Sequence, residues 1–325
     1  MTTSTSTLLA PIAADLEEFE RRLHETVQSD LGPMAEAMEH IVNAGGKRLR
    51  PALVILACRL GEPATDDHVH ALAMGIEFIH TATLVHDDLI DEAQTRRGLA
   101  TIHAMLGSNP AIIVGDYYFA RGANLTSSIG IPRIDEVISA TVMTICMGEL
   151  LQMVTHGDLG QSVATYDEKI ERKTAALLSA CTYTGGIVAR LDQTRQEALR
   201  NYGSLLGMAF QMADDVLDYV ATEEEIGKPT GADLKQGQVT LPLMYALEDP
   251  GVGLRLRRLL AREERSDEDY RTVVDLVRAS DGVQRTEARA HEFADRARAE
   301  LRLFADTPAR ASLESLCDYV VERRI

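Results

Sequence analysis

The sequence predicts an all-α protein, and three observations support that class. Apolar residues recur at three- and four-residue spacing in long segments, which cover residues 14–27, 69–90, 135–154, 167–188 and 194–219. The sequence has no series of alternating, strand-like segments, and its one Asp-Gly pair, at Asp281, has no strand-like flanks. Prolines stand mostly between the helical segments, where helices begin or end. We therefore expect one domain over residues 1–325, a single large bundle of roughly ten or more helices around a deep central cavity, with a flexible segment at residues 1–13.

One helical segment is apolar over most of its circumference. Residues 145–151 read ICMGELL and carry Glu149 as their only charge. We expect such a helix to lie in the middle of the bundle, because it offers little polar face to water. A cavity between helices of this kind suits a long apolar ligand.

Composition excludes several classes of protein. The net charge of −17 argues against nucleic-acid binding, which needs clustered Lys and Arg. The cysteines, Cys58, Cys146, Cys181 and Cys317, form no CxxC pair, so we expect buried, reduced thiols in a cytoplasmic protein. Residues 1–11 lack the basic start and apolar run of a signal peptide. No segment approaches the ~20 apolar residues of a membrane span, so we expect peripheral membrane contact at most.

The first cluster of acidic residues lies in LVHDDLIDEAQTRRG, residues 84–98. On a helix, Asp87 and Asp91 stand one turn apart on one face, with Asp88 beside them. Such carboxylates repel one another unless a cation lies among them, and Mg²⁺ is a hard ion that takes oxygen ligands. Taken alone, the cluster fits a solvated acidic helix end equally well.

The second cluster, FQMADDVLDY at residues 210–219, repeats the DDxxD spacing with Asp214, Asp215 and Asp218. Gln211 lies about one turn before Asp214 and shares its face. Two copies of an arrangement that is costly to desolvate are hard to assign to solvated surface. Facing each other, they would hold several Mg²⁺ ions around one diphosphate.

Basic residues gather in two short stretches. In NAGGKRLRP, residues 43–51, two glycines end a helix and Pro51 suits the first turn of the next. The basic residues of this connection are Lys47, Arg48 and Arg50. An anion there would meet these side chains and the free N–H groups of a helix start, although an exposed basic turn also fits. Arg96 and Arg97 follow the first cluster directly, and guanidinium groups suit phosphate oxygens.

Lysines occur near both acidic clusters. The stretch IGKPTGADLKQGQVTLP, residues 226–242, carries Lys228 and Lys235 and fits either a phosphate-binding lid or an ordinary surface loop. Lys173 and Thr174 lie in the middle of a predicted helix. Lys173 could point into the same cavity, although a lone helical lysine is usually solvated.

Together these motifs resemble the trans-isoprenyl diphosphate synthases, also called polyprenyl synthetases. GGKRLRP, HDDLIDEAQTRRG, KT, FQMADDVLD and GKPTGADL occur in the family's order over nearly the whole chain. The resemblance implies an all-α homodimer with a central cavity in each subunit and several Mg²⁺ ions, three when diphosphate is bound. It implies a prenyltransferase that condenses an allylic diphosphate, such as farnesyl diphosphate, with isopentenyl diphosphate, releases diphosphate and makes a trans-polyprenyl diphosphate.

The resemblance also implies a role for each matched residue. The metal ligands would be Asp87, Asp88, Asp91, Asp214 and Asp218. The allylic diphosphate and its departure would involve Arg96, Lys173, Gln211 and Lys228. The diphosphate of isopentenyl diphosphate would be held by Lys47, Arg50, His80 and Arg97. Thr174 and Asp215 complete the expected substrate-binding set. His80, in IEFIHTATL, also fits a satisfied core histidine.

Two features concern the departure of diphosphate and the closing of the site. The family often carries a second lysine, in a GKxTLP pattern, where this chain has Gln238. Lys235 is close enough in sequence to supply the missing charge. The basic tail, Arg323 and Arg324, resembles tails that close over the site, although a frayed C-terminus fits equally.

Product length is expected to depend on residues below the first cluster. Ala82 and Thr83 are small at the two positions where, in the family, large aromatics stop growth at short products. The next barrier would come from the face shared by Ile138, Val142 and Ile145, none of which is aromatic. We therefore expect a medium- to long-chain product, with geranylgeranyl diphosphate as the alternative.

Rival functions make different demands on the sequence. A class I terpene cyclase shares the helical fold but carries a different second metal motif and lacks the GGKRLRP and RRG elements. A non-catalytic partner subunit would have lost several aspartates or basic elements, all of which are present. A phosphohydrolase needs His-Asp pairs, and only His86 with Asp87 supports that reading.

Overall fold

The computed structural model describes residues 5–29, 39, 41, 48–63, 65–96, 98–221, 230–262 and 264–322. The elements within these ranges are α1 (Thr5–Leu8), η1 (Ala10–Ile12), α2 (Ala13–Ser29), α4 (Leu49–Cys58), α5 (Asp66–Ile90), β1 (Thr95–Arg96), β2 (Leu99–Ala100), α6 (Ile102–Leu106), α7 (Ser108–Ser128), α8 (Pro132–Val154), α9 (Val163–Ile170), η3 (Glu171–Ala175), α10 (Ala176–Val188), α11 (Gln193–Val220), α13 (Ala232–Lys235), α14 (Leu241–Glu248), α15 (Val252–Leu260), α16 (Asp267–Ala279), α17 (Gly282–Glu300), η4 (Leu301–Leu303) and α18 (Pro308–Glu322).

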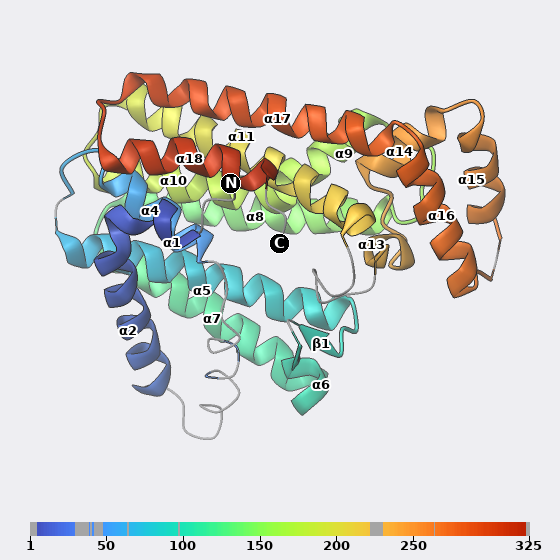
Figure 1. Ribbon diagram of the computed structural model, residues 1–325. Helices are drawn as coiled ribbons and strands as arrows, with labels where there is room; N and C mark the ends of the chain where they lie inside the picture. The colour runs from blue at the N-terminus through green and yellow to red at the C-terminus, as the bar shows by residue number, and fades with distance from the viewer. Residues whose placement is uncertain are drawn as a thin grey trace.

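The predicted all-α class is confirmed. Figure 1 shows α5 and α7 along one side of the bundle and α17 and α18 along the opposite side, with α15 and α16 at one end. Helix α4 is apolar all round and is buried from Pro51 to Cys58. The strands described are β1 and β2, which form a two-stranded antiparallel sheet with Arg96 opposite Leu99.

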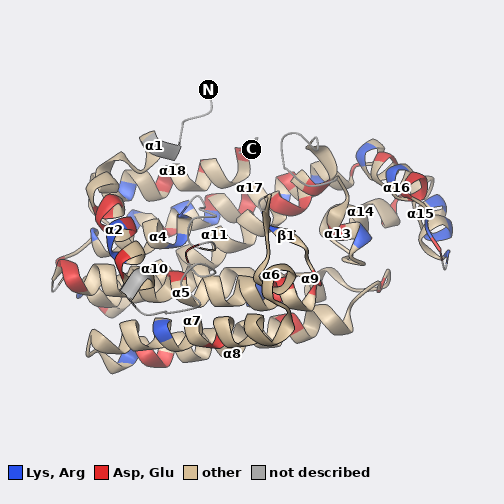
Figure 2. Ribbon diagram, turned by 90° about the horizontal axis from the view of Figure 1, so that it is seen from below, with Lys and Arg blue, Asp and Glu red and all other residues tan. Residues whose placement is uncertain are grey.

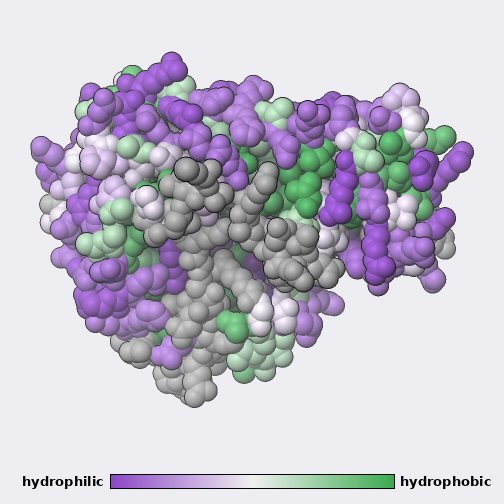
Figure 3. All heavy atoms as spheres, in the orientation of Figure 1, coloured by the Kyte–Doolittle hydropathy of each residue, from purple (hydrophilic) through white to green (hydrophobic). Residues whose placement is uncertain are grey.

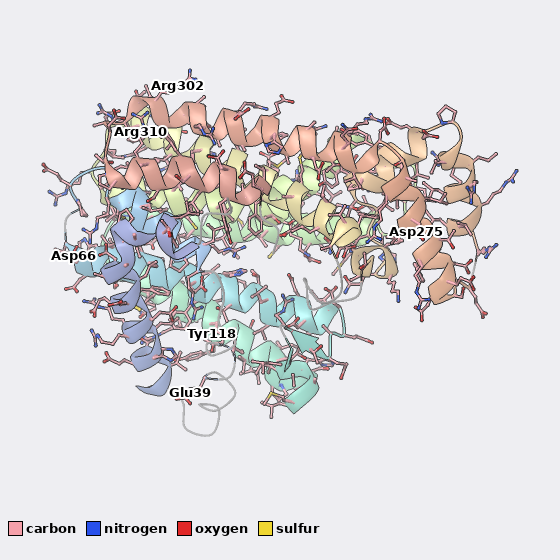
Figure 4. The ribbon with its side chains drawn as sticks, in the orientation of Figure 1. Glu39, Asp66, Tyr118, Asp275, Arg302 and Arg310 are labelled. Carbon is pink, nitrogen blue, oxygen red and sulfur yellow. The ribbon has the colours of Figure 1, made fainter. Side chains whose placement is uncertain are left out.

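Helix α5 carries the first acidic cluster at its end. The Thr65 side chain caps its start by accepting from the backbone N–H of His68 at 3.2 Å. One face of α5 packs against α7, where the rings of Phe78 and Tyr118 stack with centroids 5.4 Å apart. Figure 4 labels Tyr118 at this contact. Because α5 is held along its length, the position of Asp87 near its end is fixed by the core.

Helix α11 carries the second acidic cluster at its own end. Asp192 caps its start, and the buried hydroxyl of Tyr202 donates to the Leu313 carbonyl of α18 at 2.8 Å. The last turns of α11 contain Asp214, Asp215 and Asp218. Both acidic clusters therefore lie at the C-terminal ends of long helices that the core anchors.

The segment 167–188, predicted as one helix, is interrupted. Helix α9 ends at Ile170, η3 is one turn of π-helix, and α10 begins at Ala176. A π-helical turn holds an extra residue and turns the side chains that follow it, and such turns occur often at functional sites. Lys173 and Thr174 both lie within this turn.

The expectation that residues 145–151 lie in the middle of the bundle is wrong. Helix α8 lies at the margin of the molecule beside α7 and is largely uncharged (Figure 2). Ile138 and Ile145 are buried, whereas Met147 and Leu150 are 51% and 55% exposed. Cys146 is also exposed, contrary to expectation, while the other three cysteines are buried. An apolar circumference predicts that a helix is buried, but it does not say whether the same chain or another molecule covers it. Here only one side of α8 packs against the rest of the chain.

The membrane expectation also needs correction at α8. Over 23 residues this helix is long and apolar enough to cross a membrane by length and composition, and 17% of its most apolar window is buried. By contrast with α8, the described residues on the face seen in Figure 3 are mostly hydrophilic. Length and composition alone are weak evidence for a membrane span.

Candidate active site

The first acidic cluster is followed by the small sheet, whose first strand brings Arg96 back to it. Asp87 and Asp88 lie in the last turn of α5, and Asp91 caps that helix. The chain turns back through β1, where Arg96 donates from Nε to Oδ1 of Asp88 at 2.7 Å. Asp88 is buried, so this charge-assisted hydrogen bond fixes the guanidinium beside the cluster.

The second acidic cluster is held by neutral donors. Tyr166 of α9 donates its hydroxyl to Oδ2 of Asp215 at 2.6 Å, and Gln211 donates from Nε2 to Oδ1 at 2.9 Å. Thr174 donates in turn to Oε1 of Gln211 at 2.8 Å. Asp218 accepts from the backbone N–H of Asp233 at 3.2 Å. The predicted residues Thr174, Gln211 and Asp215 therefore form one connected network.

Lys173 links the first cluster to α8. Its ammonium lies 2.5 Å from Oε2 of Glu149 and 3.9 Å from Oδ2 of Asp87. The close approach depends on Gly148, where an added Cβ would come within 2.8 Å of the Lys173 backbone nitrogen. Lys173 therefore points into the site, as predicted, rather than into solvent.

A cavity of about 180 Å³ contains residues from both acidic clusters. Its lining consists of Asp91, Gln152, Tyr166, Lys169, Ile170, Lys173, Thr174, Gln211, Asp215, Asp233, Gln236, Gln238 and Thr240. A second cavity of about 290 Å³ shares Asp91, Gln152, Gln236 and Gln238 with it and extends along α8 to His156. The two acidic clusters therefore open onto one connected space.

Burial raises the pKa values of the carboxylates at this space. Burial raises the pKa of Asp87 to about 6, against the lowering effect of Lys173. Burial also raises the pKa of Asp215 to about 7, with Asp233 adding to the effect. The pKa values of Asp88 and Asp91 are raised as well, mainly by burial. Such carboxylates favour a cation among them.

The donor set fits Mg²⁺. Among the described residues, no three His, Cys, Asp or Glu side chains are grouped closely enough to hold a metal by themselves. Mg²⁺ commonly takes one or two carboxylates and completes its octahedron with phosphate oxygens and water. Asp87 and Asp91 on one side and the carboxylates of α11 on the other offer oxygen ligands of this kind.

The basic element before α4 is described in part. Nη1 of Arg50 donates to Nε2 of His80 at 2.9 Å, so these two predicted residues meet. Arg48 is bound in ion pairs with Glu20 and Glu77, at 2.6 and 2.9 Å, and serves the packing of α2 on α5. Lys47, Arg97 and Lys228 lie outside the described residues, as do Arg323 and Arg324.

The expectation that Lys235 replaces the family's second lysine is wrong. Its ammonium pairs with Asp267 of α16 at 2.6 Å and lies over the Tyr270 ring, 5.8 Å from its centroid. Gln238, by contrast, lines the cavity. Three residues of separation on a turn are enough to direct the two side chains to different surfaces.

The residues expected to govern product length differ in burial. Ala82 is fully buried in the core, and Thr83 is half-buried with its hydroxyl donating to the His80 carbonyl at 2.7 Å. On α8, Ile138 is buried and Val142 is half-buried against the same core. The expected shared face of Ile138, Val142 and Ile145 is therefore buried to different degrees.

Several cavity residues escaped the sequence analysis. Glu149 was visible as the lone charge of an apolar segment, and Gln152 lies one turn further along the same helix. Tyr166, Lys169 and Asp233 gave no such signal, because a single polar residue in an amphipathic pattern is usually solvated. Only the π-helical turn and the path of the chain after α11 bring them to the site.

Comparison with known proteins identifies the family of this chain. Residues 33–277 match the polyprenyl synthetase family. The chain is 37% identical over 312 residues to heptaprenyl diphosphate synthase component 2 of Geobacillus stearothermophilus, covering 96% of this chain and 97% of that one. It is 36% identical over 313 residues to octaprenyl diphosphate synthase of Escherichia coli (strain K12), covering 96% of each.

A solved structure agrees along the whole chain. The polyprenyl synthase from Caulobacter crescentus CB15, crystallised with calcium and isoprenyl diphosphate, has a TM-score of 0.93 at 38% sequence identity. The alignment covers 100% of this chain and 99% of that one. The chain therefore belongs to the polyprenyl synthetase family and is a trans-polyprenyl diphosphate synthase.

Proposed function

We propose that this enzyme condenses an allylic diphosphate with isopentenyl diphosphate at the cavity between α5 and α11, in a reaction that requires Mg²⁺. The observation that carries the proposal is the meeting of both acidic clusters and Lys173 at one connected space. Carboxylates can bind Mg²⁺, and an ammonium can bind phosphate oxygens. A site that has both therefore suits a diphosphate with Mg²⁺ bound to it better than free Mg²⁺ or free diphosphate.

The residues around this space have separate tasks in the reaction. Asp87, Asp88, Asp91, Asp214 and Asp218 would hold Mg²⁺, which neutralises charge on the departing diphosphate when it is bound. Lys173 adds positive charge beside Asp87, and Gln211 offers a hydrogen bond from the opposite side. Arg50 and His80, which meet at the start of α4, would position the diphosphate of isopentenyl diphosphate.

The reaction needs no protein nucleophile. The bond between C1 of the allylic substrate and its diphosphate oxygen breaks, and the double bond of isopentenyl diphosphate attacks the allylic cation. A proton then leaves the new unit, and the freed diphosphate accepts it. Water must be kept from the allylic cation, because it would otherwise capture the cation.

We propose a product of medium or long chain length. The heptaprenyl and octaprenyl synthases named above make products of this class by their names, and they match the present chain over nearly its whole length. Ala82 and Thr83 leave no aromatic ring directly below Asp87.

Incubation with farnesyl diphosphate, labelled isopentenyl diphosphate and Mg²⁺ tests both parts of this proposal. We expect products longer than geranylgeranyl diphosphate, separated by reversed-phase chromatography, and no product when EDTA replaces Mg²⁺. A single product of geranylgeranyl length would refute the chain-length proposal, and labelled product in EDTA would refute the metal requirement. One relative is named as component 2 of its enzyme, so activity of the purified chain alone would show that no second component is needed.

We also propose that two chains pair through a homodimer interface on α7 and α8. Helices α7 and α8 follow one another in the chain, and both expose apolar side chains. These include Ile112 and Ile113 of α7 and Met147, Leu150 and Met153 of α8. Exposed apolar surface of this kind marks an interface, and in a two-fold contact each subunit would contribute the same residues.

Leu150→Glu is expected to make the enzyme monomeric. A charge in the centre of an apolar interface is left without a partner, and we expect dimer affinity to fall about 100-fold or more. Sedimentation velocity at micromolar protein measures the change. Leu254→Glu on α15 is the matched control, because Leu254 is equally exposed, at 56%, but lies outside this surface. A monomeric wild type, or a dimeric Leu150→Glu variant, would contradict the proposed interface.

A further inference from the structure

Lys169 is a buried lysine in the wall of the active-site cavity. It lies in the last turns of α9, is 5% exposed, and lines the 180 Å³ cavity together with Lys173 and Gln238. Burial lowers its pKa, while Asp215 opposes the shift and Lys173 adds to it. A buried ammonium is costly unless an anion compensates it.

Lys169 has no close carboxylate partner within the described part of the chain. Among the described residues, its ammonium forms no ion pair within 4.0 Å, whereas Lys173 has both Glu149 and Asp87 within that distance. Asp215 favours the charged form of Lys169, but each of its oxygens already accepts from a neutral donor, Tyr166 or Gln211. The charge of Lys169 is therefore available to a ligand in the cavity, because no ion pair with a described residue neutralises it.

Among the described residues, the segment that carries residue 238 brings no cation to this cavity. Gln238 and Thr240 line the same cavity and offer neutral hydrogen-bonding groups. Lys235, the basic residue in the described part of that segment, pairs with Asp267 outside the cavity. Among the described residues, therefore, Lys169 of α9 brings a cation to this cavity and the segment before α14 does not.

We propose that Lys169 is a diphosphate-binding residue, which contacts the departing diphosphate of the allylic substrate and replaces the charge that Gln238 does not provide. The proposal rests on the proposed function, because it assigns this cavity to the allylic diphosphate. An ammonium on α9 and an amide at residue 238 would grip the diphosphate from two sides, each through hydrogen bonds that are strongest when the acceptor is charged.

A purely structural role for Lys169 predicts a different result from second-site substitutions. If Lys169 only offsets the buried charge of Asp215, then Asp215→Asn should make Lys169 dispensable. If Lys169 binds diphosphate, a new lysine at residue 238 should make it dispensable, and Asp215→Asn should not. The two second-site changes therefore separate the two roles.

Calorimetric titration of the full enzyme with inorganic diphosphate, in the presence of Mg²⁺, tests the proposal without product formation. Lys169→Met keeps the length and apolar stem of the side chain and removes only its charge. We expect the Kd for diphosphate to rise about 10- to 100-fold, as for the loss of one charged hydrogen bond. We expect Lys169→Met/Gln238→Lys to return to within about threefold of wild type, and kcat to follow Kd while KM for isopentenyl diphosphate changes little.

Lys235→Met is the matched control, because Lys235 is a lysine of the neighbouring segment whose charge is paired outside the cavity. It should bind diphosphate as the wild type does. Unchanged Kd in Lys169→Met, or recovery through Asp215→Asn instead of Gln238→Lys, would overturn the proposal.

If Lys169→Met does not fold, Gln238→Lys in the wild type decides. A gain in diphosphate affinity under about threefold supports Lys169 as the existing cation, and a gain above about tenfold refutes it. Failure of the wild type to make product would refute the proposed function, whereas the diphosphate titration would still report on Lys169.

Discussion

Asp87→Asn is expected to lower the rate of prenyl transfer by about 100-fold or more. Asparagine keeps the size of the side chain and removes the charge that would hold Mg²⁺ opposite the carboxylates of α11. It also removes the anion that lies 3.9 Å from the Lys173 ammonium, which would then turn wholly toward Glu149. The measurement is kcat with saturating substrates at several Mg²⁺ concentrations, where the loss should persist at high Mg²⁺.

Asp214→Asn should give a loss of the same order, because under the proposed function both clusters hold Mg²⁺ at one diphosphate. The control is Asp275→Asn on α16, an exposed aspartate outside the cavity that Figure 4 labels. It keeps the overall charge change the same and should leave the rate unaltered. Near-wild-type activity of either Asp87→Asn or Asp214→Asn would show that the proposed metal clamp is wrong.

The sequence predicts the acidic ends of α5 and α11 well, and there is a physical reason. Each DDxxD cluster is local, so a helical period alone places its carboxylates on one face. The two clusters share a cavity because the core holds their long helices together. Two copies of a pattern that is costly to desolvate already indicate that both serve one binding site. Gln211 could be found for the same reason, because it stands one turn from the second cluster, whereas Thr174 is assigned through the family resemblance.

The sequence predicts less where the partner of a side chain lies far along the chain. Helix α8 and a core helix have the same composition, because apolar residues do not say whether the same chain or another molecule covers them. Lys235 and Lys169 show the same limit with opposite outcomes. Lys235 stands close to the motif and pairs with Asp267 outside, whereas Lys169 stands far from Gln238 and lines the same cavity.

Thr83→Phe is expected to shorten the product by several isoprene units. Residues four apart share a face of α5, so residue 83 lies one turn below Asp87 on the side that carries it. A phenyl ring at this level would occupy space into which the growing tail must pass. Thr83 is the better test position, because Ala82 is fully buried. A ring at residue 82 would overpack the core and lower the free energy of unfolding by about 1–3 kcal/mol. Chromatography of the labelled products from farnesyl diphosphate measures the change.

The matched control for this prediction is Thr83→Val, which keeps the branched shape and removes the hydroxyl that donates to the His80 carbonyl. If product length depends on the volume at residue 83, Thr83→Val should give the wild-type product and only Thr83→Phe a shorter one. If it depends instead on how residue 83 holds the helix beneath His80, both variants should change it. Equal product lengths in all three enzymes would mean that the tail leaves the cavity by another route. In that case the limit on chain length would have to be sought on α8, where Ile138 and Val142 face the same core.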